Sequence, residues 1–211
     1  MTPGPIGRVH VLVDSVPLAE AALEGGAPTL QARVKAGPDR HRYETVAAIV
    51  ERCRDAGATC VVNDRADFAV AAGADGVHVG AQDLTVSEVR RILGPQAIVG
   101  ATARDRVRAR KLVAEGASYL GVGPTYSTGS KVGLPQPLGP VGVRDIAESV
   151  DVPVIAIAGI TPARVPKVMA AGAWGVAVIG AVSGADDPHA ATHDLVVAVA
   201  RALESLEAVS R

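Results

Sequence analysis

The chain has 211 residues and a formal net charge of −1; 48% of its residues are apolar and only 2% are aromatic. This length suits one domain, whose core must be built from Val, Ala, Leu and Ile, residues that pack well in parallel strands covered by helices. A net charge near zero provides no electrostatic basis for binding nucleic acid or an anionic membrane, so we expect neither partner.

The cysteines and the apolar stretches favour a cytoplasmic protein. Cys53 and Cys60 form no metal-binding motif and no disulfide framework, which favours buried, reduced thiols. The first residues lack the basic and apolar regions of a signal peptide, and the most apolar stretches, 152–160 and 173–182, are too short to span a membrane. We expect small-molecule partners; the sequence leaves the oligomeric state open, a homo-oligomer included.

Short apolar runs alternate with longer amphipathic runs along the whole chain. The predicted strands cover residues 8–13, 29–33, 59–62, 76–79, 97–100, 119–122, 154–158 and 175–179. The predicted helices cover residues 17–24, 42–56, 65–72, 86–93, 105–115, 140–149, 162–171 and 189–206. This alternation predicts an α/β fold, a closed (β/α)8 TIM barrel formed by residues 1–211 as a single domain. The alternative, an open doubly wound sheet, usually carries a glycine motif in its first turn, which is missing here.

Local signals define some of the boundaries and interior positions. Thr85 and Glu88 have the spacing of a capping box, and Thr161 followed by Pro162 predicts the start of a helix. His10 and His78 lie in predicted strands and are expected to be interior residues rather than ligands.

Two acidic residues follow consecutive predicted strands. Asp64 and Asp83 are separated by one predicted helix, so both carboxylates should lie side by side at the mouth of the barrel. Two carboxylates that close repel each other unless a cation lies between them. Mg²⁺ suits this position because it takes one or two protein carboxylates and completes its shell with water and phosphate oxygens. The alternatives are a helix cap for Asp64 and an ordinary loop acid for Asp83.

A long segment, residues 123–139, shows neither a helical nor a strand period. It is rich in glycine, proline and hydroxyl side chains, and Lys131 is its only charged residue. Because it follows the sixth predicted strand, it should open onto the face where barrel enzymes bind their substrates. Thr128, Ser130 and Lys131 are therefore candidates for phosphate binding; a solvated surface lysine is the alternative.

Two further groups lie after predicted strands. Gln31, Arg33 and Lys35 alternate along the end of the second strand, where an amide could read a heterocycle edge and two cations could bind pyrophosphate. Gly159 and Gly180 follow the seventh and eighth strands, where barrels often bind a phosphate through backbone N–H groups. A polar strand end facing water and tightly packed turns are the alternatives.

Taken together, these motifs resemble the thiamine phosphate synthase family over roughly residues 8–190. The resemblance rests, in chain order, on Gln31-x-Arg33-x-Lys35, Asn63-Asp64-Arg65, residues 74–80, Asp83, residues 121–124, Thr128-x-Ser130-Lys131 and residues 156–161. It implies a (β/α)8 transferase that uses Mg²⁺. Such an enzyme couples 4-amino-2-methyl-5-hydroxymethylpyrimidine pyrophosphate with hydroxyethylthiazole phosphate, giving thiamine phosphate and pyrophosphate by a dissociative substitution.

The resemblance also implies roles for individual residues. Asp64 and Asp83 would bind Mg²⁺, and Gln31 would face the pyrimidine. The pyrophosphate would be held by Arg33, Lys35, Asn63, Thr102 and Lys131, of which Arg33, Lys35 and Lys131 would assist its departure. The thiazole phosphate would be surrounded by Thr128, Ser130, Gly159, Ile179 and Gly180. No general base is required, because the thiazole nitrogen attacks as a neutral group.

The chain departs from the family pattern at four positions. Thr102 replaces serine, Ser130 replaces threonine, Ala81 replaces glutamine and Ala158 replaces glycine. Two other functions therefore stay open, a thiazole tautomerase and a non-catalytic phosphate-binding barrel. Pro124 disfavours the tautomerase, whose members commonly carry histidine at that position and need no metal.

Overall fold

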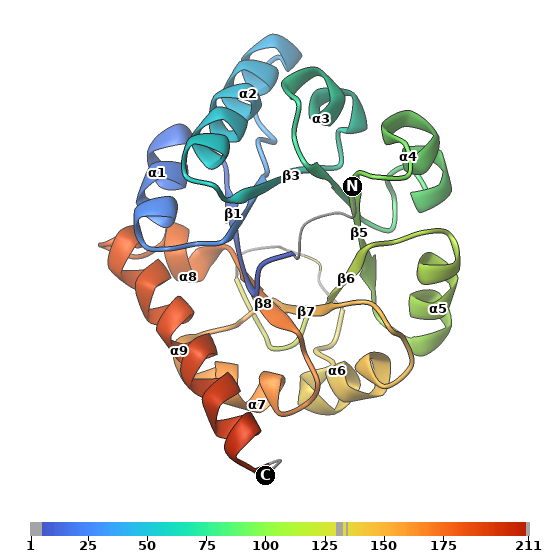
Figure 1. Cartoon of the computed structure of the whole chain (residues 1–211), viewed down its shortest axis with the longest axis vertical. Helices are drawn as coiled ribbons and strands as arrows, with labels where there is room; N and C mark the ends of the chain where they lie inside the picture. Colours follow the sequence, from blue (N-terminus) through green and yellow to red (C-terminus); the bar gives the residue numbers. More distant parts are fainter. Residues whose placement is uncertain (1–5, 130–132, 134, 210–211) are drawn as a thin grey trace.

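Eight parallel strands close into a barrel in chain order in the computed structural model, which describes residues 6–129, 133 and 135–209 (Figure 1). The strands are β1 (Val9–Val13), β2 (Thr29–Ala32), β3 (Thr59–Asn63), β4 (Gly76–Val79), β5 (Ile98–Ala103), β6 (Tyr119–Val122), β7 (Val154–Ile157) and β8 (Gly175–Val178). Closure is made by β8 and β1, with Val176 opposite Val9 and Val178 opposite Val11. The predicted barrel is confirmed, and the alternative of an open sheet is wrong.

The helices form a ring around the strands (Figure 1). They are α1 (Val16–Glu24), α2 (Asp39–Asp55), α3 (Ala66–Ala72), α4 (Val86–Leu93), α5 (Arg106–Ala114), α6 (Gly139–Ala147), the 3₁₀ turn η1 (Pro162–Arg164), α7 (Val165–Met169), α8 (Gly180–Ser183) and α9 (Pro188–Val209). Within the described part of the chain, none of these helices combines the length and apolar character needed to cross a membrane.

The interior of the barrel is built differently from the layer between strands and helices. The outer layer is a continuous cluster of buried Val, Ala, Leu and Ile. A smaller inner cluster includes Leu12, Val61, Tyr119 and Ile155. The ring of Tyr119 fills space that Gly100 leaves, since a Cβ at Gly100 would overlap that ring. Small residues on one strand thus make room for a large side chain from its neighbour.

Helix boundaries agree with the sequence signals at one site and differ at another. The capping box is confirmed: Glu88 N donates to Thr85 Oγ1 at 3.2 Å, and Thr85 N donates to Glu88 Oε2 at 2.7 Å. The predicted helix 162–171 is wrong in its first turn, which is η1 and has no side-chain cap from Thr161. Pro166 has no N–H to donate to the carbonyl of Pro162, so the α-helical ladder cannot begin there.

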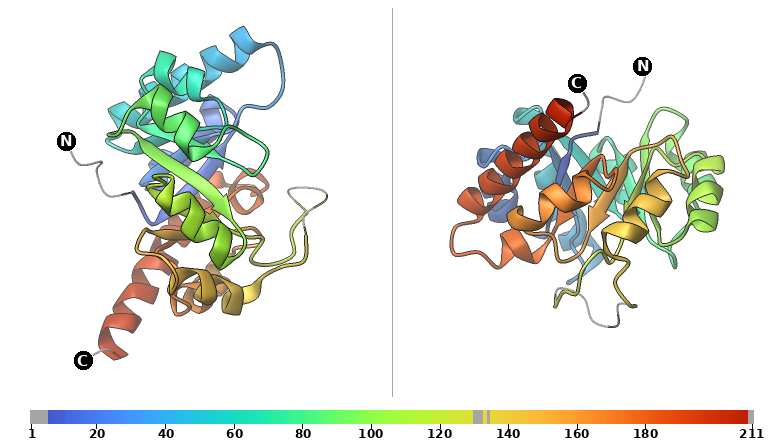
Figure 2. Two further views of the ribbon diagram at one scale, coloured as in Figure 1. Left: turned by 90° about the vertical axis from the view of Figure 1, so that its right-hand side faces the viewer. Right: turned by 90° about the horizontal axis from the view of Figure 1, so that it is seen from below.

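The connections that leave the carboxyl ends of the strands lie at one end of the barrel, opposite the described start of the chain (Figure 2). The described residues between β6 and α6 also lie at this end, as the left-hand view shows. They contain no helix or strand, as predicted. The residues predicted to bind substrates are therefore expected at a single face.

Candidate active site

Three charged side chains meet at the rim above β2, β3 and β4. Lys35 Nζ forms an ion pair with Asp64 Oδ2. Asp83 lies close enough to Asp64 for their side chains to interact, and its Oδ2 accepts a hydrogen bond of 2.8 Å from Gly80 N. These strands are neighbours in the barrel, so the structure brings together both predicted metal ligands and one predicted pyrophosphate cation.

The two carboxylates of this group face a single lysine, so a bound cation would balance the remaining negative charge. Burial and the adjacent Asp64 raise the pKa of Asp83, although Gly80 N–H and Lys35 act in the opposite direction. A like charge beside a carboxylate disfavours its ionised form and so raises its pKa. Among the described residues, no group of three or more His, Cys, Asp and Glu side chains could hold a metal. Two carboxylates alone suit Mg²⁺, which keeps waters and phosphate oxygens in its shell.

Among the residues that the structure describes, two other than glycine adopt positive φ, and both follow strands at this end of the barrel. Asp64 has φ 65° and its N–H donates to His78 O at 2.8 Å, while Ala158 has φ 76° and precedes Gly159 at φ 65°. Asp64 does not cap α3, which begins after Arg65 and has no side-chain cap. A methyl group is disfavoured in the left-handed region. The positive φ at position 158 would therefore explain why the family pattern has glycine where this chain has Ala158.

A chain of buried and half-buried polar side chains crosses the interior from β2 to β5. The side chain of Gln31 lies close enough to the Tyr119 hydroxyl to affect its pKa; that hydroxyl lies 3.0 Å from His78 Nδ1, and His78 Nε2 lies 3.0 Å from Thr102 Oγ1. Burial lowers the pKa of His78 to about 4, so the imidazole is neutral at pH 7. Burial also raises the pKa of Tyr119. Gln31 is buried beside this hydroxyl, which contradicts the alternative of a strand end facing water, and its assignment to the pyrimidine stays a prediction.

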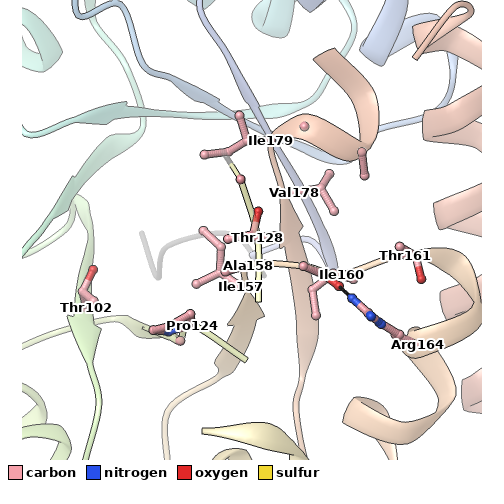
Figure 3. Close-up of a pocket in the computed structure, with 16 residues that line it drawn as sticks. Thr102, Pro124, Thr128, Ile157, Ala158, Ile160, Thr161, Arg164, Val178 and Ile179 are labelled. Carbon is pink, nitrogen blue, oxygen red and sulfur yellow. Dashed lines mark hydrogen bonds between the residues drawn. The ribbon is translucent and has the colours of Figure 1, made fainter. Parts of the chain in front are cut away.

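A pocket of about 570 Å³ lies above the other half of the barrel (Figure 3). The predicted residues Thr102, Thr128, Gly159, Ile179 and Gly180 all line it. Figure 3 shows Thr102 on one side and Ala158 and Ile179 on the side of β7 and β8. The structure thus brings together the residues assigned to the thiazole phosphate that lie within the described chain.

Of the remaining predicted residues, two lie at the ends of strands and two lie outside the described part of the chain. Arg33 directly follows β2, where its N–H donates to Val13 O at 2.7 Å, and Asn63 ends β3 opposite His78. Ser130 and Lys131 lie outside the described residues, so their assignment stays a prediction.

The structure also identifies residues that the sequence analysis did not select. Tyr119 joins Gln31 to His78 inside the barrel, and Arg164 lines the pocket from η1. Gly100 is paired directly opposite Tyr119 and leaves room for its ring, but this pairing is known only from the sheet register. Arg164 carries no sequence signal either, because it falls inside a segment predicted as an ordinary helix.

A closed (β/α)8 barrel with a carboxylate pair and a pocket at the carboxyl ends of its strands defines the class of TIM-barrel enzymes. A family profile described as thiamine monophosphate synthase matches residues 9–182. The chain belongs to this family.

Individual relatives agree with this membership. The chain is 47% identical over 203 residues to a thiamine-phosphate synthase of Salinispora arenicola, covering 92% of this chain and 98% of the relative. It is 46% identical over 185 residues to a thiamine-phosphate synthase of Moorella thermoacetica, covering 88% of each. The solved structure of a thiamine phosphate pyrophosphorylase from Pyrococcus furiosus matches with a TM-score of 0.85 and 36% identity, over 93% of this chain and 96% of that one.

Proposed function

We propose that this chain is a thiamine phosphate synthase. It joins 4-amino-2-methyl-5-hydroxymethylpyrimidine pyrophosphate to hydroxyethylthiazole phosphate and releases pyrophosphate. The observation that carries the proposal is the division of the barrel mouth into two parts. One part holds Lys35, Asp64 and Asp83 in contact, and the other is a separate pocket lined by Gly159 and Gly180. Such a mouth suits two substrates with separate anionic groups.

At the charged part of the mouth, the protein would bind the leaving group. Asp64 and Asp83 would hold Mg²⁺, which would neutralise charge on the departing pyrophosphate when bound. Lys35 and Arg33 follow the adjacent strand β2 and would add positive charge to the same group. We assign Asn63 and Lys131 to this group as well, on the family resemblance. Thr102 has the same assignment from the resemblance but lines the separate pocket, so it would lie where the two parts of the mouth meet.

The reaction breaks the bond between the pyrimidine methylene carbon and the pyrophosphate oxygen. The electron pair of that bond leaves with pyrophosphate, and the thiazole nitrogen then donates its lone pair to the carbon. Gln31, which lies beside Tyr119, would orient the pyrimidine, and the neutral imidazole of His78 would place no positive charge beside the cationic ring. The main requirement on the protein is therefore to position two rings and stabilise a leaving anion.

The tautomerase alternative receives no support from the pocket. A tautomerase must move a proton between ring atoms, which calls for a general acid and base near the thiazole. The described residues that line the pocket include no Asp, Glu or His, and Pro124 is among them.

We place the reaction in the cytoplasm. Cys53 and Cys60 are both buried, and both are free thiols. The interaction with the neighbouring Cys53 and, after it, burial raise the pKa of Cys60 well above its usual value, which keeps that thiol protonated and unreactive. Unpaired thiols are usual in a reducing compartment.

The proposal is tested by incubating the purified protein with both substrates, with Mg²⁺ or with a chelator. We expect thiamine phosphate and pyrophosphate in equal amounts, only when both substrates and Mg²⁺ are present, detected by liquid chromatography. Isomerised thiazole without coupled product would identify a tautomerase. Unchanged substrates under all conditions would leave a non-catalytic binding barrel.

A further inference from the structure

The pocket above β5 to β8 contains little charge for the phosphate that it is proposed to bind. Its described lining consists of apolar side chains, glycines, threonines and one charged residue, Arg164. Arg164 lies at the end of η1, and Figure 3 shows its side chain reaching back toward the turn that follows β7. A phosphate dianion entering such a site is stabilised most by a cation with several N–H donors.

Two contacts orient the guanidinium group of Arg164. Its Nη1 donates a hydrogen bond of 2.6 Å to Gly159 O, and its Cζ lies 4.5 Å from the centroid of the Tyr126 ring. The first contact uses one of several N–H donors, and the second fixes the plane of the group against an aromatic face. An arginine already held in this way loses less side-chain entropy when it binds a ligand.

The parts that hold Arg164 are themselves packed together. Tyr126 N donates to Ala158 O at 3.1 Å, which ties the segment after β6 to the turn after β7. A Cβ at Gly159 would lie 2.7 Å from Ser127 O and 2.8 Å from Tyr126 Cβ, so these backbones are in close contact. Arg164 therefore contacts two pocket segments, at Gly159 and Tyr126, that are packed tightly against each other.

From these observations we propose that Arg164 is a specificity-determining residue that binds the phosphate group of the thiazole substrate. The inference rests on the proposed function, and it assigns to this side chain the preference for the phosphorylated thiazole over the free alcohol. The pyrimidine pyrophosphate is bound at the other part of the mouth and does not depend on Arg164.

The test is a cycle of two ligands and three proteins measured by isothermal titration calorimetry. The ligands are hydroxyethylthiazole phosphate and unphosphorylated hydroxyethylthiazole. The proteins are the parent, Arg164→Gln, which keeps an N–H donor for Gly159 but removes the charge, and Arg164→Lys, which keeps the charge. We expect Arg164→Gln to weaken binding of the phosphorylated ligand about 10- to 100-fold and of the free alcohol less than about threefold. Arg164→Lys should recover much of that loss.

Lys167→Ala is the matched control, because Lys167 is an exposed cation on α7 that does not line the pocket. It should leave the preference for phosphate unchanged. Equal losses for both ligands in Arg164→Gln, or no loss for either, would overturn the assignment. The proposed function is tested separately by the coupled product: a parent protein that makes no thiamine phosphate contradicts the function, whereas the calorimetric cycle tests Arg164 alone.

Discussion

At the residue scale, the two rim carboxylates differ in how the protein holds them. Asp64 is paired with Lys35 and lies at positive φ, so its position is set by both an ion pair and the backbone. Asp83 accepts a hydrogen bond from Gly80 N, but burial and Asp64 raise its pKa. The ionised form of Asp83 is thus disfavoured in the folded protein without a bound cation. Such a carboxylate gains more than an ordinary surface acid when a cation binds beside it.

We expect Asp83→Asn to lower turnover about 100-fold and to raise the Mg²⁺ concentration needed for half-maximal activity. The amide keeps an oxygen for Gly80 N–H but removes the charge that would bind the metal. Because the raised pKa means that ionised Asp83 destabilises the fold, the variant should be at least as stable as the parent at pH 7. Activity at several Mg²⁺ concentrations and urea unfolding would check both statements. Parent turnover at limiting Mg²⁺ would refute the metal assignment.

The residues that could be selected from sequence are those whose chemistry and position in the chain both point to a function. Asp64 and Asp83 follow apolar strands and Gln31 lies near the end of one, so in a barrel of parallel strands all three fall at the end where substrates bind. Tyr119 and Arg164 are different, because their roles depend on contacts with residues from other strands and loops. A sequence pattern does not contain those contacts, so these two residues emerge only from the structure.

At the element scale, two loops at the site are tied together by the start of α2. Asp39 accepts hydrogen bonds from Arg65 Nη1 at 3.0 Å and from Arg42 Nη1 at 2.9 Å, and Arg42 Nε donates to Val34 O at 3.1 Å. Val34 precedes Lys35, and Arg65 follows Asp64. Asp39 therefore connects the loop that carries Lys35, a predicted pyrophosphate ligand, with the loop that carries Asp64, a predicted metal ligand.

We expect Asp39→Ala to lower kcat/KM for the pyrimidine pyrophosphate about five- to tenfold with little change in melting temperature. Surface ion pairs contribute little to stability, but misplacing a catalytic group by a small distance is costly to the rate. Glu44→Ala is the control, since Glu44 forms an ion pair with Arg40 on the same helix, at 3.4 Å, and this pair does not involve Asp39. Steady-state kinetics for both variants would decide; equal values for the two would show that Asp39 has no positioning role.

The order of strands and helices was predictable because each strand is a short apolar run and each helix an amphipathic one. Differences arise where that contrast fails. β5 extends to Ala103, three residues beyond the predicted end, because its small residues continue the ladder with β6, where Ala103 is opposite Val122. α8 has only four residues, too few to show a period. In the predicted helix 162–171, Pro166 lacks the N–H that would bond to Pro162 O, so the first turn is 3₁₀ and α7 begins only at Val165.

At the scale of the whole molecule, the barrel encloses two neutral histidines. Burial lowers the pKa of His10 to about 3 and that of His78 to about 4. The Tyr119 ring lies between them, with centroids 5.3 Å from His10 and 5.5 Å from His78. His10 Nε2 is 2.9 Å from Gly7 O. The charge of Asp83 acts to raise the pKa of His78, but the effect of burial is larger. In the unfolded chain both side chains would titrate near their usual pKa of about 6.5.

The stability of the fold should therefore fall as the pH drops below about 6.5, since the unfolded chain takes up protons that the folded barrel excludes. Each histidine contributes a slope of up to about 1.4 kcal/mol per pH unit between its folded and unfolded pKa values. His10→Leu removes one of these groups, and the carboxylates common to both proteins cancel in the comparison. We expect the difference in unfolding free energy between parent and variant to be smaller at pH 5 than at pH 7.5, measured by urea denaturation. Parallel pH profiles would mean that His10 is not excluded from protonation by the fold.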